Sequence, residues 1–187
     1  STTQFAALTT TQFNALSTTN IVVLDTTEIS SLRSSQIAAL GSGIVSVLTT
    51  TQISALTSTQ AQGLTTTEVH ALSGAQVGAL DSSAVAALTA IQLGALTTTG
   101  VNSLSTTSVN ALTTNQVKAV STTFLRALNT TQIDTLTTQQ IAVLQGSQIN
   151  GLSTTSIRAF NTTEISALTT SQMRNLNSSV VAALTTT

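Results

Sequence analysis

Thr49-Thr50-Thr51-Gln52-Ile53-Ser54-Ala55-Leu56 is one copy of an eight-residue unit that is repeated along the chain. A large apolar residue returns every eight residues from Leu8 to Leu184, and only Val120 and Phe160 replace leucine in that series. The 187 residues therefore divide into 23 octads and a partial unit, without insertion or deletion. Unbroken phase of this kind predicts a single structural unit that is stacked many times.

The composition excludes several classes of protein. The apolar content of 41% is strictly periodic, whereas disordered chains lack apolar residues. Five basic residues and a net charge of -1 leave little capacity to neutralise phosphates, so we do not expect nucleic-acid binding. Polar residues interrupt every octad, and no apolar run approaches the roughly 20 residues of a membrane span. The absence of Cys excludes a disulfide framework and CxxC metal sites.

The residue types within the octad predict a short helix. We number its positions 1 to 8, with the leucine at position 8. Positions 1 to 3 are mostly Thr or Ser, position 4 is usually Gln or Glu, position 5 is apolar and position 7 is mostly Ala. Thr-x-x-Gln before an apolar residue is the capping-box pattern, in which the side chains of positions 1 and 4 each bond the other residue's backbone N–H. We predict a helix over positions 2 to 8, about two turns and ~10 Å long, that buries positions 5 and 8.

The few charged residues support this helix. Acids in a first turn and bases in a last turn are the arrangement that the helix dipole favours. Five of the six acids stand at position 1 or 4, namely Asp25, Asp81, Glu28, Glu68 and Glu164. Four of the five bases stand at position 6, namely Lys118, Arg126, Arg158 and Arg174. Arg33 at position 1 and Asp134 at position 6 are the exceptions.

The alternative fold is a β-solenoid, because Thr, Val and Ile favour strands and positions 5 and 7 could point inward. The Ala-Leu pair, the Gln or Glu at position 4 and the scattering of the nine Gly over different octad positions argue against it. The preferred fold class is an all-α solenoid of short helices, one per octad, forming a single array over residues 1–187. A two-turn helix is unstable alone, so neighbouring octads must bury its apolar face. Two, three or more octads could form each coil. The chain starts in register and stops within a unit, so we expect a piece of a longer array or a processed product.

No catalytic, cofactor-binding or metal site is predicted. His70 is the only histidine, and Cys, a second His and spaced carboxylates are lacking, so we interpret it as a surface residue. Glu68 lies two residues away, where helical side chains point apart. The N-glycosylation pattern occurs at Asn129, Asn161 and Asn177, all at position 1. Asn is a good helix N-cap, and capping explains these residues without a sugar.

The Ser and Thr tracts are the most informative surface feature of the sequence. Ordered stacking would place their hydroxyl groups in rows, although Gly74, Ala75, Ala90 and Ile91 interrupt the pattern. The rows are interpreted as caps that also keep the helix starts soluble. The alternative is recognition of an ordered surface such as ice, by analogy of composition. Stacked repeats without polar capping units expose apolar edges, so end-to-end or lateral self-association is also expected.

Tandem units such as Leu48-Thr49-Thr50-Thr51-Gln52-Ile53-Ser54-Ala55-Leu56 and Thr162-Thr163-Glu164-Ile165-Ser166-Ala167-Leu168 resemble the Thr/Gln-rich "LTTxQIxAL" arrays of very large bacterial secreted or surface proteins. The resemblance covers the whole chain and implies an extracellular, fibre-like or adhesin-like setting. It carries over no catalytic or binding residues. We therefore expect a non-enzymatic structural protein at the cell surface or outside the cell, acting as a spacer, a stalk or a filament subunit. The alternatives are an adhesin segment and a module whose Thr rows bind an ordered surface.

Overall fold

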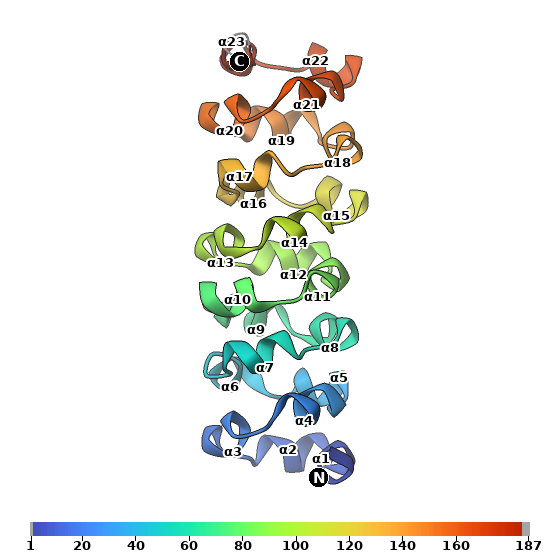
Figure 1. The fold of residues 1–187 in the computed structure, drawn as a ribbon, viewed down its shortest axis with the longest axis vertical. Helices are drawn as coiled ribbons and strands as arrows, with labels where there is room; N and C mark the ends of the chain where they lie inside the picture. Colours follow the sequence, from blue (N-terminus) through green and yellow to red (C-terminus); the bar gives the residue numbers. More distant parts are fainter. Residues whose placement is uncertain (1, 185–187) are drawn as a thin grey trace. The chain divides into compact units, whose positions relative to one another are not determined.

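The computed structural model describes residues 2–184, which form 23 α-helices, one in each octad, and no strand (Figure 1). The chain divides into two compact units, residues 1–104 and residues 105–187. The helices of the first unit are α1 Thr2–Ala7, α2 Thr10–Asn14, α3 Thr18–Val22, α4 Thr26–Ser31, α5 Ser34–Ile37, α6 Gly41–Val45, α7 Thr50–Ser54, α8 Ser58–Gly63, α9 Thr66–Ala71, α10 Gly74–Ala79, α11 Ser82–Ala87, α12 Ala90–Ala95 and α13 Thr98–Ser103. Those of the second unit are α14 Thr106–Asn110, α15 Thr114–Ala119, α16 Thr122–Ala127, α17 Thr130–Ile133, α18 Thr138–Ala142, α19 Gly146–Gly151, α20 Thr154–Arg158, α21 Thr162–Ser166, α22 Thr170–Arg174 and α23 Ser178–Leu184. The all-α prediction is confirmed, and the β-solenoid alternative is wrong for these residues.

Most helices stop one or more residues earlier than predicted. In the octad of α8, Leu64 at position 8 has φ -62° and ψ 137°, and Thr65 at position 1 of the next octad has φ -73° and ψ 160°. These two extended residues form the whole link between α8 and α9. The sequence rule that ends the helix at the leucine is wrong, because the leucine must leave the helix for the chain to turn.

Each unit is a coil with three helices per turn. In the first unit, α4 contacts α1 and α7, and α10 contacts α7 and α13. In the second unit, α17 contacts α14 and α20, and α18 contacts α15 and α21. Because partners are always three octads apart, one turn of the coil consists of three octads. Equivalent positions on successive turns therefore stack within each unit (Figure 1).

Positions 5 and 8 form most of the core, as predicted, and position 4 is also buried in most octads, which was not predicted. Ile53 at position 5 has no exposed surface and Leu56 at position 8 is 4% exposed. The same pattern recurs in the second unit, where Ile149 is fully buried and Leu152 is 8% exposed. Burying each such side chain contributes about 1.5–3 kcal/mol, so stacking against neighbours stabilises helices that are too short to stand alone.

Side-chain caps begin most helices. At α7 the Thr49 backbone N–H donates to Gln52 Oε1 at 3.0 Å, and the Gln52 N–H donates to Thr49 Oγ1 at 3.2 Å. This pair is the predicted capping box. At α11 the Asp81 carboxylate accepts from the Ser83 N–H at 2.8 Å, and its hydrogen bonds with Ser83 lower the pKa of Asp81. Arg33 caps no N–H with its side chain and instead donates to the Leu8 carbonyl at 2.7 Å.

Among residues 2–184, no helix is both long enough and apolar enough to cross a membrane.

Candidate functional site

Glutamine at position 4 joins successive turns of the coil. Its Oε1 completes the capping box, while its Nε2 donates to two backbone carbonyls one turn below. Gln52 Nε2, for example, lies 2.9 Å from both Ile21 O and Leu24 O. The same bonds, 2.6–3.3 Å long, run from Gln36 to Phe5 and Leu8, Gln60 to Ile29 and Leu32, Gln76 to Val45 and Leu48, Gln92 to Ala61 and Leu64, Gln140 to Val109 and Leu112, Gln148 to Val117 and Val120, and Gln172 to Ile141 and Leu144.

The glutamine amides donate to carbonyl groups near the end of a short helix. The carbonyl at position 8 belongs to an extended residue and has no partner within its own helix. A buried carbonyl without a partner costs free energy, so the amide stabilises both the cap above and the turn below. The sequence reasoning missed this role. The available signal was that Gln stands at position 4 in twelve octads and Glu in three, although both suit a capping box.

Glu68 at position 4 carries an acceptor where glutamine carries a donor, and the backbone opposite it is rearranged. Its Oε2 completes the cap at Thr65, and its Oε1 accepts from the Gly41 N–H at 2.9 Å. Leu40 has ψ -35°, in contrast to 137° at Leu64, and Gly41 has φ +73°. The peptide between Leu40 and Gly41 is therefore turned over, so that it presents N–H rather than C=O to the carboxylate. Only glycine adopts this φ readily.

Within residues 2–184, Glu164, also at position 4, has no N–H turned toward its second carboxylate oxygen. Its Oε2 accepts from the Asn161 N–H at 2.8 Å, while its buried Oε1 has no hydrogen-bond partner among the described residues. Burial raises the pKa of Glu164, and the charge of Asp134 raises it further, against the opposing effect of the bond from Asn161.

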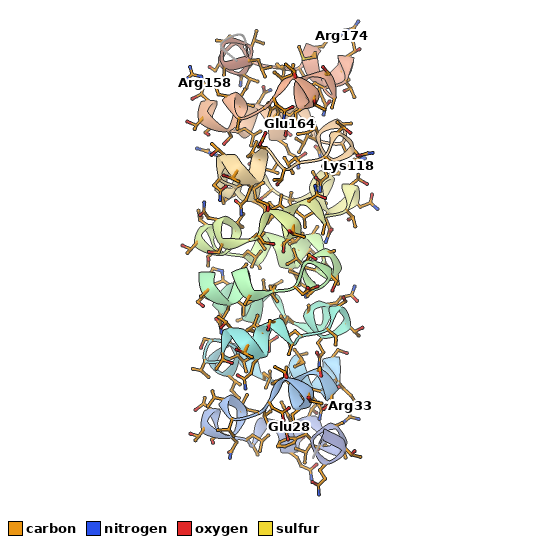
Figure 2. All side chains as sticks on the ribbon, in the orientation of Figure 1. Glu28, Arg33, Lys118, Arg158, Glu164 and Arg174 are labelled. Atoms are coloured by element: carbon orange, nitrogen blue, oxygen red, sulfur yellow. The ribbon has the colours of Figure 1, made fainter. Side chains whose placement is uncertain are left out.

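The other residues singled out from the sequence lie apart from one another. His70 is exposed, and its Nδ1 lies 3.0 Å from Ala95 O on the next turn, while Glu68 is buried. Within residues 2–184, no group of three or more His, Cys, Asp or Glu side chains could hold a metal ion. Figure 2 shows Lys118, Arg158 and Arg174 at the periphery of the second unit, and Arg126 is also exposed.

The three asparagines of the glycosylation pattern are helix caps, as interpreted from the sequence. Asn129 Oδ1 accepts from the Gln132 N–H at 2.9 Å. Asn177 Oδ1 accepts from the Val180 N–H at 2.9 Å. Asn161 Oδ1 accepts from the Thr163 and Glu164 N–H groups, and its Nδ2 donates to Asp134 Oδ1 at 3.1 Å.

Stacking in threes sorts the Ser and Thr residues onto separate edges. The interruptions at Gly74, Ala75, Ala90 and Ile91 lie on α10 and α12. Because each turn has three helices, each unit has three edges, and every third helix lies on the same edge. The edge formed by α2, α5, α8 and α11 in the first unit, and by α14, α17, α20 and α23 in the second, carries Ser or Thr at positions 2 and 3 of every helix. We call it the hydroxyl edge. In the first unit it contains Thr10, Thr11, Ser34, Ser35, Ser58, Thr59, Ser82 and Ser83. In the second unit it contains Thr106, Thr107, Thr130, Thr131, Thr154, Thr155, Ser178 and Ser179, all of them exposed.

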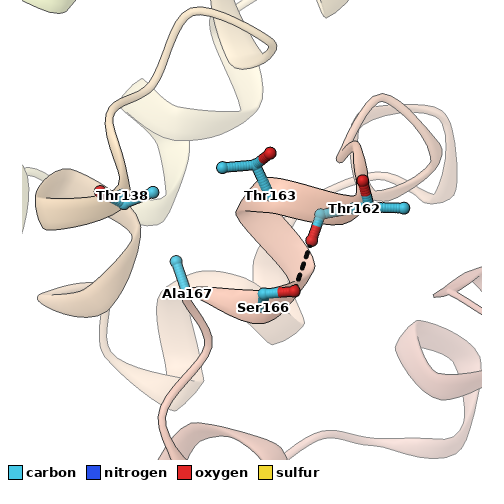
Figure 3. A pocket seen from close by; sticks show the side chains of 5 residues that line it. All are labelled: Thr138, Thr162, Thr163, Ser166 and Ala167. Carbon is cyan, nitrogen blue, oxygen red and sulfur yellow. Dashed lines mark hydrogen bonds between the residues drawn. The ribbon is translucent and has the colours of Figure 1, made fainter.

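Equivalent recesses open along the hydroxyl edge of the second unit. One, of about 270 Å³, is lined by Thr106, Thr107, Asn110 and Thr135. Another of the same volume is lined by Thr130, Thr131, Asp134 and Ala159, the equivalent residues three octads further on. A larger recess of about 470 Å³ lies on another edge between α18 and α21, where Thr138 faces Thr163 and Ala167 (Figure 3). The linings consist mainly of hydroxyl and methyl groups, with the Asn110 amide in one recess and the Asp134 carboxylate in another, and none of the three has a cluster of ionisable side chains.

Comparison with known protein families identifies three matching segments. Residues 90–122, 123–154 and 141–178 each match the ALTTAQ repeat family, and together they span just under half of the chain. A comparison with curated proteins finds no match. The matched segments begin in the first unit and extend through most of the second.

Proposed function

From the premise that residues 90–178 consist of ALTTAQ repeats, we propose that the chain is a non-enzymatic structural protein, an extracellular or cell-surface spacer, stalk or filament subunit. The observation that carries the proposal is the position-4 glutamine. Within each unit it joins successive turns by the same two bonds, so a turn can be added without changing the rule of assembly. A protein built in this way sets a length through the number of its octads.

Small-angle X-ray scattering tests the spacer directly. A compact globular chain of this length has a radius of gyration of about 16 Å. A spacer is expected to exceed that value clearly, with a maximum dimension that grows when three complete octads, one full turn, are inserted in phase. A matched insertion of two and a half octads breaks the octad phase and is expected to lower stability instead. A globular radius, or equal tolerance of both insertions, would contradict the proposal.

Self-association is the filament form of this proposal. Met173 and Val181 at position 5 are 46% and 43% exposed, whereas the same position is buried in α19 and α20. A further turn of the same kind, from a second copy of this chain, would cover them. Sedimentation velocity over a range of concentrations tests this. Growth into larger species that Met173→Lys and Val181→Lys abolish is expected, and an unchanged monomer at all concentrations would rule it out.

The hydroxyl edge favours a second candidate, a module that binds an ordered surface such as ice or that serves as an adhesin segment. This edge is the one without interruption, and in the second unit two equivalent recesses lie on it, one turn apart. The test is ice recrystallisation inhibition and thermal hysteresis. If the edge binds ice, the double variant Thr107→Lys/Thr131→Lys loses the activity, while Thr123→Lys/Ser147→Lys on a neighbouring edge keeps it. No activity in the parent chain would remove ice as the surface.

A further inference from the structure

Only one of the two oxygen atoms of the buried Glu164 carboxyl group has a hydrogen-bond partner among the described residues. The residue is 2% exposed. Its Oε2 is held by the Asn161 N–H, and its Oε1 lacks a partner among the described residues. A buried polar atom without a hydrogen bond is costly, so the position of Oε1 requires a physical account.

The glutamines at position 4 of the neighbouring octads indicate which groups lie opposite Oε1. In the same unit, Gln140 Nε2 donates to Val109 O and Leu112 O, and Gln172 Nε2 donates to Ile141 O and Leu144 O. The two acceptors stand at the same sequence offsets before each glutamine. Counted back from Glu164, the same positions are Ile133 and Leu136. Carbonyl oxygens only accept, so an ionised Oε1 at this place has no donor to meet.

At Glu68 the backbone supplies a donor to the carboxylate, and this arrangement is absent at Glu164. There the turned peptide at Gly41 supplies an N–H to the carboxylate. The residue at the same offset from Glu164 is Thr137, which has φ -72° and ψ 158°, the ordinary extended cap. Its N–H already donates to Gln140 Oε1 at 2.8 Å. The backbone below Glu164 therefore keeps the form that suits glutamine.

We propose that Glu164 holds a proton and acts as a pH-sensitive latch between successive turns of the second unit. In the neutral form its carboxyl O–H donates to the carbonyl oxygen of Ile133 or Leu136, in place of the glutamine amide. When the proton passes to solvent, that bond is lost and a negative charge faces carbonyl oxygens. Helix α21 then loses its side-chain hydrogen bond to the turn below, while Gln148 in α19 and Gln172 in α22 keep theirs.

The charged groups around Glu164 act in the same direction. Asp134, which follows α17, is the acidic neighbour, and burial together with its charge raises the pKa of Glu164. Helix α18, which packs against α21, carries no titratable side chain. The bases of the adjoining helices, Arg158 and Arg174, are exposed and lie at the periphery, away from Glu164 (Figure 2).

The direction of the pKa shift fixes the direction of the pH effect. A carboxyl group whose pKa is higher in the folded than in the unfolded chain binds more protons when folded. Its contribution to stability is fully present below the unfolded pKa and is lost as pH rises through the folded pKa. The bond from Glu164 to the turn below is therefore present below the unfolded pKa and is lost as pH rises through the higher folded pKa.

Two measurements test the latch. The chain has only three glutamates, so the ¹³C carboxyl signals of glutamate-labelled protein can be followed singly, and the signal missing from Glu164→Gln is that of Glu164. Its midpoint is expected above the ordinary glutamate value of about 4.3. As pH rises from the ordinary glutamate value through the midpoint measured for Glu164, the urea midpoint of the parent is expected to fall relative to that of Glu164→Gln.

Glu28→Gln is the matched control. It removes one carboxylate from position 4 of α4, where Oε2 likewise accepts the N-cap N–H, at 3.2 Å from Asp25 N. The fall in the parent's urea midpoint with rising pH is expected to persist in Glu28→Gln and to vanish in Glu164→Gln. A Glu164 midpoint at or below the ordinary value, or the same pH profile in the parent and Glu164→Gln, would overturn the proposal. Gln is the commonest residue at position 4, so Glu164→Gln keeps the local fold.

Discussion

Gln52 bonds three backbone groups with one side chain. Its Oε1 holds the Thr49 N–H, and its Nε2 holds the carbonyls of Ile21 and Leu24. The first bond makes the helix begin, and the other two fix which turn lies beneath it. Glutamic acid can make only the first bond while ionised. Local capping and long-range stacking therefore depend on the same amide, and the two can be separated by substitution.

Gln52→Glu keeps the capping acceptor and removes the donor between turns. We expect a loss of about 1–3 kcal/mol in the free energy of unfolding at neutral pH, because two buried carbonyls lose their partner. Gln12→Glu is the control, since exposed Gln12 makes the capping box with Thr9. Urea unfolding followed by circular dichroism measures both variants. Equal effects would show that the inter-turn bonds contribute nothing.

Gly41 is the one described residue with a positive φ, and its Cβ position is otherwise free of contacts. Gly41→Ala is expected to destabilise by about 1–2 kcal/mol, since the left-handed region strains an alanine. Gly43→Ala in the same helix also meets no neighbour, and it is expected to stabilise slightly because alanine favours the helix. Thermal unfolding of the two variants is the comparison.

The turned peptide at Gly41 and the carboxylate of Glu68 should depend on each other. Glu68→Gln places an amide opposite an N–H, which favours turning the peptide back to its ordinary form. In that form alanine at position 41 is unstrained, so the double variant Gly41→Ala/Glu68→Gln is expected to be more stable than the sum of the single effects. A double-mutant cycle measures the coupling. Additive effects would contradict the link between the two residues.

Each element is a helix of four to seven residues, so its stability comes from burial rather than from its own hydrogen bonds. Ile149→Ala removes a fully buried position-5 side chain and is expected to cost about 2–5 kcal/mol. Met173 also stands at position 5 but is 46% exposed, so Met173→Ala is expected to lower the free energy of unfolding by much less than Ile149→Ala. Chemical denaturation gives both values. Similar losses at the two sites would show that stacking does not set helix stability.

The helix and its cap could be predicted from Thr49, Gln52, Ile53 and Leu56 because capping and periodicity are local properties. The number of octads per turn could not. It depends on the angles at the two extended residues of each link, such as ψ 137° at Leu64 and ψ 160° at Thr65. Residue type does not specify these angles. The second role of the glutamine stayed hidden for the same reason, since its carbonyl partners are known only when the turn is known.

At the scale of the whole molecule, the grouping of octads into turns decides which Ser and Thr residues lie side by side on the surface. Read along 23 successive octads, the hydroxyl rows are interrupted at Gly74, Ala75, Ala90 and Ile91. With three octads per turn these residues lie on α10 and α12, and the hydroxyl edge of each unit has no interruption. Which side chains a partner would meet therefore follows from the three-octad turn. The scaffold and the surface-binding proposals both depend on it.

Spin labelling measures that turn most directly, because the chain contains no cysteine of its own. Pairs of labels at Thr51 and Ala75, three octads apart, and at Thr51 and Thr67, two octads apart, occupy exposed sites within the first unit. Stacked helices lie about 8–10 Å apart, so the Thr51/Ala75 pair is expected to show strong dipolar broadening in electron paramagnetic resonance spectra, and the Thr51/Thr67 pair much less. Stronger broadening at Thr51/Thr67 would mean two octads per turn and would contradict the account.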